Sequence, residues 1–337
     1  MLNILIDGRA LADPMAGGVP RVAKEWILDY KRNNPDNKYF CVTTGLKPSP
    51  IVDDFCQKNG FEYLHIRIPN KLWTFLSALR LVSLDHVRLS TFDVRRFDLL
   101  LLPNLGFVGQ LKTPYEVLMH DLGFVIEPKW FTLKSRLWHK LIRVNALLAR
   151  AQKIHAVSQQ TAHDITRIYQ IPDTKIQVFK FDPVILNAEP SKPSWIDEQK
   201  SYVLILGGAD PRKNAKTALT AVTQYNLAHP NQCLIPIVLG VKPGKCKNCI
   251  SPGNISDAEL AYLYQNVKAL LYPSWYEGFG LPLHEAHHFN TPCISSTAGA
   301  LPETAPPNIV FCHPAKIHEW IYALEELMRL SLMRDID

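Results

Sequence analysis

The hydrophobic positions of this 337-residue chain form short apolar runs that alternate with amphipathic stretches. Short apolar runs bounded by turn residues are typical of buried strands, and apolar residues three or four positions apart are typical of helices. The pattern predicts strands at 3–7, 38–44, 61–68, 97–103, 115–121, 153–158, 175–181, 202–208, 235–240, 268–274, 291–296 and 308–312. It predicts helices at 19–33, 72–82, 131–150, 160–169, 213–227, 256–267 and 315–332, with one more beginning near Pro282.

The alternation of strands and helices predicts an α/β fold with parallel sheets that carry helices on both faces. Residues 183–200 contain three prolines and few periodic apolar positions, which is typical of a linker. We therefore expect two Rossmann-like domains, 1–182 and 201–337, facing each other across a cleft. In such sheets ligands bind at the carboxyl ends of the strands.

Composition narrows the function classes. The net charge of +6 suits an anionic ligand or an anionic membrane surface, and no motif typical of nucleic-acid binding occurs. No apolar run is long enough to cross a bilayer, and the chain starts on a strand-like segment without a basic leader, so we expect a cytoplasmic protein.

The seven cysteines are scattered along the chain, which predicts reduced thiols. Cys246 and Cys249 form one CxxC without a second pair, and structural zinc sites usually need two pairs. Ordinary loop cysteines are therefore the favoured interpretation, and a metal or redox pair stays the alternative.

The segment "WYEGFGLPLHEA", residues 275–286, places two acids eight positions apart around two glycines. Glu277 follows a predicted strand, and Glu285 falls in the first turns of the helix that Pro282 opens. The backbone N–H groups of Phe279, Gly280 and Leu281, at a helix N-terminus, could bind an anion. A helix that merely starts with an acidic turn is the alternative.

Three further clusters lie where strands meet helices. Two cations at a predicted helix start, Arg212 and Lys213, oppose the helix dipole unless a diphosphate lies between them and the backbone; a solvated basic turn is the alternative. Gly17 and Gly18 precede the first helix, as in phosphate-facing loops, or form a simple flexible loop. His120 ends a buried strand, where it is either structural or turned to a ligand.

Together these clusters resemble the family 4 retaining glycosyltransferases, which have the GT-B fold. The resemblance is strongest over 256–303, which carries an E-x7-E pair as Glu277 and Glu285. Shorter matches are "RKN" at 212–214, "GGVPR" at 17–21, "HDLGF" at 120–124 and "AVSQQTAHDI" at 156–165, and Asn290 stands where the family usually has glycine.

The resemblance implies a nucleotide-diphosphate sugar as donor, held mainly by the C-terminal half. Glu285 would bind the ribose, Glu277 would face the transferred sugar, and His120 would contact a sugar hydroxyl. The diphosphate would be held by Arg212, Lys213, the amides of Phe279, Gly280 and Leu281, and the loop at Gly17 and Gly18.

The resemblance further implies attack by the acceptor on the front face of the donor, with the leaving phosphate as base. No cofactor and no metal are expected, because the D-x-D pattern occurs only at 335–337, outside any expected site. Fixed cations and N–H dipoles would then neutralise the leaving diphosphate.

The acceptor is expected to be a glycan or a lipid-linked glycan, as in bacterial surface-polysaccharide synthesis. Residues 71–89 and 129–143 mix aromatic and leucine side chains with lysines and arginines, which favours peripheral contact with an anionic membrane; two core-facing helices are the alternative. The resemblance to mannosyl- and rhamnosyltransferases makes GDP-mannose a candidate donor.

Two other functions fit parts of the sequence. A strand followed by GxG also occurs in NAD(P)- or flavin-dependent oxidoreductases, but "GFGLPL" lacks the third glycine and no acidic residue ends the next strand. A non-catalytic glycan-binding scaffold could keep the fold, although retention of Glu277, Arg212 and Lys213 argues against it.

Overall fold

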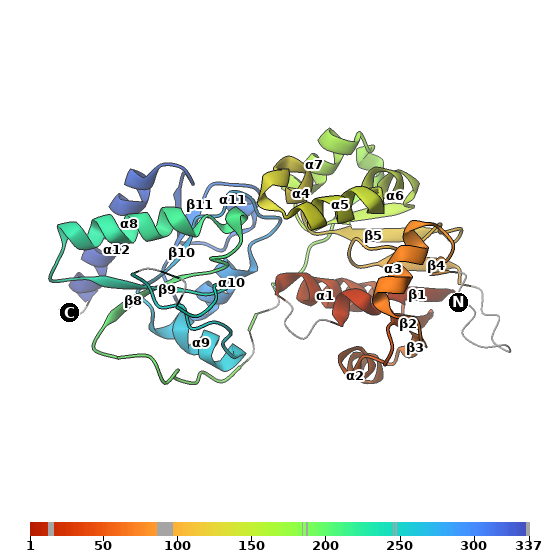
Figure 1. The fold of residues 1–337 in the computed structure, drawn as a ribbon, viewed down its shortest axis with the longest axis horizontal. Helices are drawn as coiled ribbons and strands as arrows, with labels where there is room; N and C mark the ends of the chain where they lie inside the picture. Colours follow the sequence, from red (N-terminus) through yellow and green to blue (C-terminus); the bar gives the residue numbers. More distant parts are fainter. Residues whose placement is uncertain are drawn as a thin grey trace. The chain divides into compact units, whose positions relative to one another are not determined.

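The computed structural model describes residues 1–12, 17–85, 97–183, 185–186, 188–244, 246 and 248–334, the last four by their backbone alone. The chain divides into two compact units, Met1–Val184 and Ile185–Asp337 (Figure 1). Each unit has its own parallel sheet and its own core.

The first unit is built on a sheet whose described strands are all parallel, in the order β3-β2-β1-β4-β5-β6-β7. The strands are β1 (Asn3–Asp7), β2 (Lys38–Thr44), β3 (Glu62–Ile66), β4 (Leu99–Leu102), β5 (Tyr115–Met119), β6 (Lys153–Ala156) and β7 (Ile176–Val178). The α-helices are α1 (Gly18–Asn33), α2 (Pro50–Asn59), α3 (Asn70–Ala78), α4 (Gly123–Ile126), α5 (Leu133–Ile142), α6 (Val144–Arg150) and α7 (Gln159–Tyr169). Short 3-10 helices are η1 (Gly8–Leu11), η2 (Pro128–Trp130) and η3 (Asp173–Lys175).

Side chains of this sheet alternate between its two faces, as the twofold repeat of a strand requires. Leu5 and Leu100 belong to one buried cluster, which also contains Trp73 of α3, Leu148 of α6 and Ile165 of α7. Figure 1 shows α1 and α2 on the opposite side of the sheet from α4 to α7. Both faces are therefore covered, which explains why apolar residues predominate in β1, β4 and β5.

The second unit repeats this plan with a smaller sheet. Its described strands are parallel, in the order β12-β11-β10-β8-β9. They are β8 (Ser201–Ile205), β9 (Leu234–Val238), β10 (Ala269–Tyr272), β11 (Cys293–Ser296) and β12 (Ile309–Cys312). The helices are η4 (Pro211–Lys213), α8 (Ala215–Ala228), α9 (Asp257–Asn266), α10 (Leu281–His288), α11 (Leu301–Thr304) and α12 (Ile317–Arg334).

Two buried clusters lie on the two faces of this second sheet. Val203 and Leu271 pack with α8 and α12, whereas Leu204 and Leu270, one residue away, pack with α9 and α10. Leu186 and Ile196, within the predicted linker, also lie in the latter cluster. The connecting segment is thus anchored to the core of the second unit.

The predicted fold of two Rossmann-like parallel sheets is confirmed. Two local predictions are wrong. The single helix expected over 131–150 is two helices, because Arg143 has a positive φ of 58° and ends α5. Helix α2 was not expected, although Val52, Phe55 and Cys56 have helical spacing and Gly60 ends it in the left-handed conformation.

The expectation of reduced thiols is wrong for Cys246 and Cys249, which form a disulfide. Their Cα atoms are 5.6 Å apart, a separation that a disulfide spans without backbone movement. Among the described helices, none combines the length and the hydropathy that crossing a bilayer requires.

Candidate active site

The second sheet has a switch point at β8, whose neighbours β9 and β10 lie on its two sides. In open parallel sheets, ligands bind outside the carboxyl ends of the strands at such a point. The loops that leave β8 and β10 carry Arg212, Lys213 and Glu277, so the sequence-predicted cations and the first predicted acid meet at one edge of the sheet.

Backbone contacts hold these two loops together. Asp210 caps η4 by accepting a hydrogen bond from the Arg212 amide at 2.9 Å, and the Arg212 carbonyl accepts one from the amide of Trp275 at 2.8 Å. Asn214, which is in the left-handed conformation, donates from Nδ2 to the carbonyl of Pro273 at 3.0 Å. The residues before and after Lys213, Arg212 and Asn214, are therefore both fixed to the loop after β10, and they position Lys213 between them.

Lys213 and Glu277 form a buried ion pair across these loops. Lys213 Nζ lies 2.7 Å from Glu277 Oε1 and donates to the Tyr272 hydroxyl at 2.8 Å. The side chains of Lys213 and Glu277 are 18% and 9% exposed. Tyr272, the last residue of β10, was not among the predicted site residues, because an aromatic residue in a buried strand is normally interpreted as part of the hydrophobic core.

The electrostatics of the pair keep both groups ionised. Burial alone would lower the pKa of Lys213, but the Glu277 carboxylate outweighs it and the pKa is raised. Burial alone would raise the pKa of Glu277, but the charges of Lys213 and Arg212 hold it below its usual value. Burial, followed by the charge of Glu277, raises the pKa of the Tyr272 hydroxyl, so the tyrosine stays neutral.

Gly207, in the loop after β8, makes room for Lys213. Its φ is +72°, and a Cβ at this position would lie 2.5 Å from Lys213 Cγ. Any side chain here would therefore displace the lysine stem, since non-bonded carbon atoms do not approach so closely.

Arg212 also faces an acid. Its guanidinium lies 3.5 Å from Asp210 Oδ2, and the two side chains are 18% and 39% exposed. The sequence placed Arg212 and Lys213 together as phosphate-binding cations, and it gave no sign that each has a carboxylate neighbour in the folded chain.

The backbone of Glu277 is enclosed by the loop after β11. The amide of Ala300 donates to the Glu277 carbonyl at 2.9 Å. A Cβ on Gly299, whose φ is +58°, would lie 2.5 Å from that carbonyl oxygen and 2.7 Å from the Glu277 nitrogen. The acid is thus held through its main chain as well as through Lys213.

Helix α10 begins beside this loop with the predicted proline in its first turn. Gly280 precedes it with a φ of +93°, and no side chain of the described residues caps the helix. The N-terminal amides carry partial positive charge that an anion can complement. Phe279 is fixed nearby, because its ring stacks on His284 and its carbonyl accepts from the Thr304 hydroxyl.

Glu285 lies on α10 and is buried. Its Oε2 accepts a hydrogen bond from the Tyr264 hydroxyl at 2.9 Å, and the residue is 3% exposed. Burial, followed by the charge of Glu285, raises the pKa of Tyr264 well above its usual value. Ribose binding by Glu285 stays a prediction.

The remaining predicted residues lie in the first unit. His120 follows β5, and because a carbonyl only accepts, its Nε2–H donates to the Pro103 oxygen at 2.9 Å. Burial lowers the pKa of His120, which keeps its ring neutral. Gly18 begins α1 and Gly17 precedes it, and a Cβ on Gly17 would meet no described atom within 4 Å.

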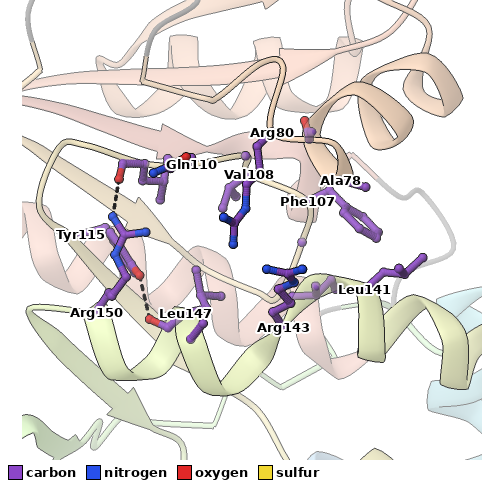
Figure 2. Close-up of a pocket in the computed structure, with 16 residues that line it drawn as sticks. Ala78, Arg80, Phe107, Val108, Gln110, Tyr115, Leu141, Arg143, Leu147 and Arg150 are labelled. Atoms are coloured by element: carbon purple, nitrogen blue, oxygen red, sulfur yellow. Dashed lines mark hydrogen bonds between the residues drawn. The ribbon is translucent and has the colours of Figure 1, made fainter.

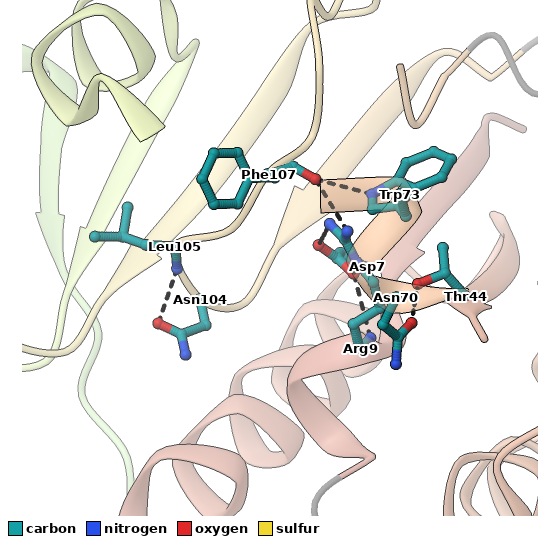
Figure 3. A network of polar contacts seen from close by, with 8 residues as sticks. All are labelled: Asp7, Arg9, Thr44, Asn70, Trp73, Asn104, Leu105 and Phe107. Atoms are coloured by element: carbon teal, nitrogen blue, oxygen red, sulfur yellow. Dashed lines mark hydrogen bonds and ion pairs between the residues drawn. The ribbon is translucent and has the colours of Figure 1, made fainter. Parts of the chain in front are cut away.

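A second polar network, at the switch point beside β1, was not predicted (Figure 3). Asp7 accepts two hydrogen bonds from the Arg9 guanidinium, at 2.8 and 2.6 Å. The Phe107 carbonyl accepts from Arg9 Nη1 at 2.9 Å and from Trp73 Nε1 at 3.0 Å. The only sequence signal was the acid–Gly–Arg order at the end of the first strand.

Comparison with known proteins identifies the second unit. Residues 188–336 match the family model described as glycosyl transferases group 1. This part of the chain is a group 1 glycosyltransferase domain. The glycosyltransferase assignment predicted from the E-x7-E block is thereby confirmed for residues 188–336. The retaining mechanism stays a prediction.

Curated relatives are similar over part of their length. The O-antigen chain mannosyltransferase B of Escherichia coli is 27% identical over 205 residues, covering 55% of this chain and 53% of that protein. The O-antigen chain mannosyltransferase RfbU of Salmonella typhimurium is 27% identical over 224 residues, covering 64% and 61%. The chain thus spans little more than half the length of these relatives.

Solved structures share the fold of the whole chain. A sucrose-phosphate synthase from Thermosynechococcus elongatus superposes with a TM-score of 0.68 at 16% identity, over 98% of this chain and 90% of that one. Anabaena HepE in complex with UDP and glucose gives a TM-score of 0.63 at 15% identity, over 97% and 90%. These similarities confirm the GT-B fold.

Proposed function

We propose that the protein is a retaining hexosyltransferase that moves mannose from GDP-mannose to a glycan or lipid-linked glycan in bacterial surface-polysaccharide synthesis, at the cytoplasmic side of the membrane. The observation that carries the proposal is the buried Lys213–Glu277 pair at the β8–β10 switch point, beside the uncapped start of α10. The similarity to O-antigen chain mannosyltransferases supports mannose as the sugar.

The proposed chemistry follows from charge. As the glycosidic bond of the donor breaks, negative charge accumulates on the leaving diphosphate. Arg212, Lys213 and the amides of Phe279, Gly280 and Leu281 would stabilise that charge more strongly in the transition state than in the ground state, which lowers the barrier. Because these groups are held by the fold, little reorganisation is needed when the bond breaks.

Glu277 has two tasks in this proposal. Its carboxylate keeps Lys213 protonated despite burial, and it faces the hydroxyls of the transferred sugar. Glu285 would bind the ribose, His120 a donor-sugar hydroxyl, and Gly17 and Gly18 the diphosphate. These roles are carried over from the family resemblance.

The proposed reaction uses neither a cofactor nor a metal. The D-x-D pattern of 335–337 lies outside the described residues. Activity should persist in EDTA, and a loss in EDTA that Mg²⁺ restores would contradict this part of the proposal.

Donor turnover tests the site. We expect Glu277→Gln and Arg212→Ala each to lower kcat by roughly 10²- to 10³-fold with purified protein and GDP-mannose. Arg212→Ala removes a cation that stabilises the leaving diphosphate, and Glu277→Gln removes the carboxylate that keeps Lys213 protonated. Lys216→Ala, an exposed lysine three residues from Lys213, is the matched control and should retain activity. Full turnover by either site variant refutes the assignment, and a product with inverted anomeric configuration refutes retention.

Ligand binding separates the alternatives. GDP or another nucleoside diphosphate should raise the Tm of the wild-type protein. A rise with NAD alone would indicate the oxidoreductase, and no rise with any nucleotide would favour the glycan-binding scaffold.

A further inference from the structure

A second concave site lies in the first unit, between the end of α3 and the α5–α6 junction. Three arginines, Arg80, Arg143 and Arg150, line this cavity of about 70 Å³, and the described residues that line it include no acid (Figure 2). Figure 2 shows the guanidinium groups of Arg80 and Arg143 converging on the pocket from opposite sides. Three like charges around one hollow repel each other unless an anion joins them.

Two of these arginines occupy an unusual backbone conformation. The φ angles of Arg80 and Arg143 are 61° and 58°, in the left-handed region that residues with side chains rarely adopt. Glycine is the ordinary choice at both places, a turn after α3 and the junction of α5 and α6. Arginine at two such positions around one cavity points to a use for the guanidinium groups.

The walls of the cavity are built by packing. Gly109, with φ of +76°, lets its loop approach Ser83 so closely that a Cβ would lie 2.0 Å from the Val82 carbonyl oxygen. Arg150 donates to the Leu111 carbonyl at 2.7 Å, which fixes its guanidinium at the rim. The cavity therefore exists before any ligand arrives, and ordering its groups costs a ligand little affinity.

One buried hydroxyl in the lining lacks a partner. Ser77 is 4% exposed, and its Oγ makes no hydrogen bond within the described part of the chain. Buried polar groups are normally hydrogen-bonded, so an unpaired hydroxyl beside three cations is a candidate ligand contact.

Exposed apolar side chains lie next in sequence to the lining arginines, and one of them, Leu141, itself lines the cavity. Leu79 and Leu81, on either side of Arg80 in sequence, are 54% and 68% exposed, and Leu141, two residues before Arg143, is 49% exposed. Leu137 and Trp138 of α5 are exposed as well. These residues belong to the amphipathic segments 71–89 and 129–143, of which 86–89 lie outside the described residues.

We propose that this pocket binds the phosphate or diphosphate group of a lipid, with the exposed leucines against the lipid chain. The arginines match phosphate oxygens in charge and geometry, because a guanidinium presents several donors in one plane. A free phosphate compound would use the same arginines but would gain nothing from the leucines. The lipid would be the acceptor carrier, a point that rests on the proposed function.

The first test measures binding of inorganic pyrophosphate to the full chain by calorimetry, in the Arg212→Ala background so that the proposed donor diphosphate site does not contribute. Arg80→Gly and Arg143→Gly each remove a guanidinium and relieve the positive φ, so stability should be kept while pyrophosphate affinity falls about tenfold or more. Arg67→Gly, an exposed coil position in the same unit, removes the same charge and should change affinity little. Equal affinity in all three variants, or no pyrophosphate binding, overturns the site.

The second test identifies the source of the phosphate. Phosphatidylcholine vesicles with phosphatidic acid should retain wild-type protein on flotation, plain phosphatidylcholine vesicles should not, and Arg80→Gly and Arg143→Gly should weaken the retention. Pyrophosphate binding without any vesicle retention would overturn the lipid assignment and leave a free phosphate ligand. Neither test measures transfer, so failure here is distinct from failure of the proposed function.

Discussion

Each sheet has an ion pair at its switch point, but the two pairs differ in the sequence separation of their partners. Asp7 and Arg9 are two residues apart, and the pair fixes one turn after β1. Lys213 and Glu277 are 64 residues apart, and their pair joins the loops after β8 and β10.

The difference in sequence separation determines what each pair can do. The Arg9 guanidinium is occupied by two Asp7 oxygens and the Phe107 carbonyl, so its donors serve the fold. Lys213 contacts a neutral tyrosine and an acid, and it can turn a donor toward an incoming phosphate without losing its charge. A local pair stabilises a turn, whereas a long-range pair aligns two loops around a ligand.

Double-variant cycles on the two pairs should give the largest effects. Lys213→Met and Arg9→Met should each lower the free energy of unfolding by roughly 3 kcal/mol, because each leaves a carboxylate buried without its partner. The double variants Lys213→Met/Glu277→Gln and Arg9→Met/Asp7→Asn should recover most of that loss. Urea unfolding measures this.

Activity then separates the pairs. Per folded molecule, transfer should be lost in the Lys213/Glu277 double variant and largely kept in the Arg9/Asp7 double variant. Equal loss of transfer in both double variants would show that the Asp7–Arg9 pair is also functional, and that the two pairs do not differ in role.

Two glycines with nearly equal φ sharpen the contrast at the second switch point. Gly244→Ala, at φ +70° with no atom of the described residues within 4 Å of the new Cβ, should cost about 1 kcal/mol of backbone strain. Gly207→Ala, at φ +72°, should cost about 1–3 kcal/mol more, because its Cβ meets Lys213.

Nucleotide affinity is the decisive readout for these glycines. Calorimetry with GDP should show weakened binding for Gly207→Ala and unchanged binding for Gly244→Ala. If both alanine variants bind GDP like the wild type, the position of Lys213 does not matter for the donor.

The smallest effect concerns pH. The raised pKa of Lys213 means that the stability from its pair is complete below the usual lysine value of 10.5 and is lost only as pH rises through the folded value. In Glu277→Gln the largest charge that raises the pKa of Lys213 is gone, and burial and Arg212 both lower that pKa. GDP affinity of this variant should therefore fall with rising pH at values where the wild type still binds; parallel pH profiles of the two proteins contradict this.

The strands were predictable because buried parallel strands are continuous apolar runs, and β1 and β2 have the predicted bounds. The helix predicted over 256–267 is α9, and Ser256 and Glu259 form a capping box at its start. The break between α5 and α6 at Arg143 was not predicted, because an arginine with positive φ does not change the helical periodicity of the apolar residues around it.

In the candidate site, the sequence indicated which loops matter but could not show which side chains pair. Glu277 and Lys213 are brought together only by the order of β8 and β10. Asn290 shows a milder limit: it replaces the family's usual glycine and still has a φ of 57°, since asparagine tolerates that conformation.

The enclosure of Glu277 by Gly299 has a consequence for altering sugar preference. The Cβ of any residue other than glycine at 299 would clash with the backbone of Glu277. Such a side chain would displace Glu277 rather than add a contact to a bound sugar. Libraries that randomise this loop would mostly yield misassembled enzymes, so redesign of donor choice should leave position 299 untouched and vary its neighbours instead.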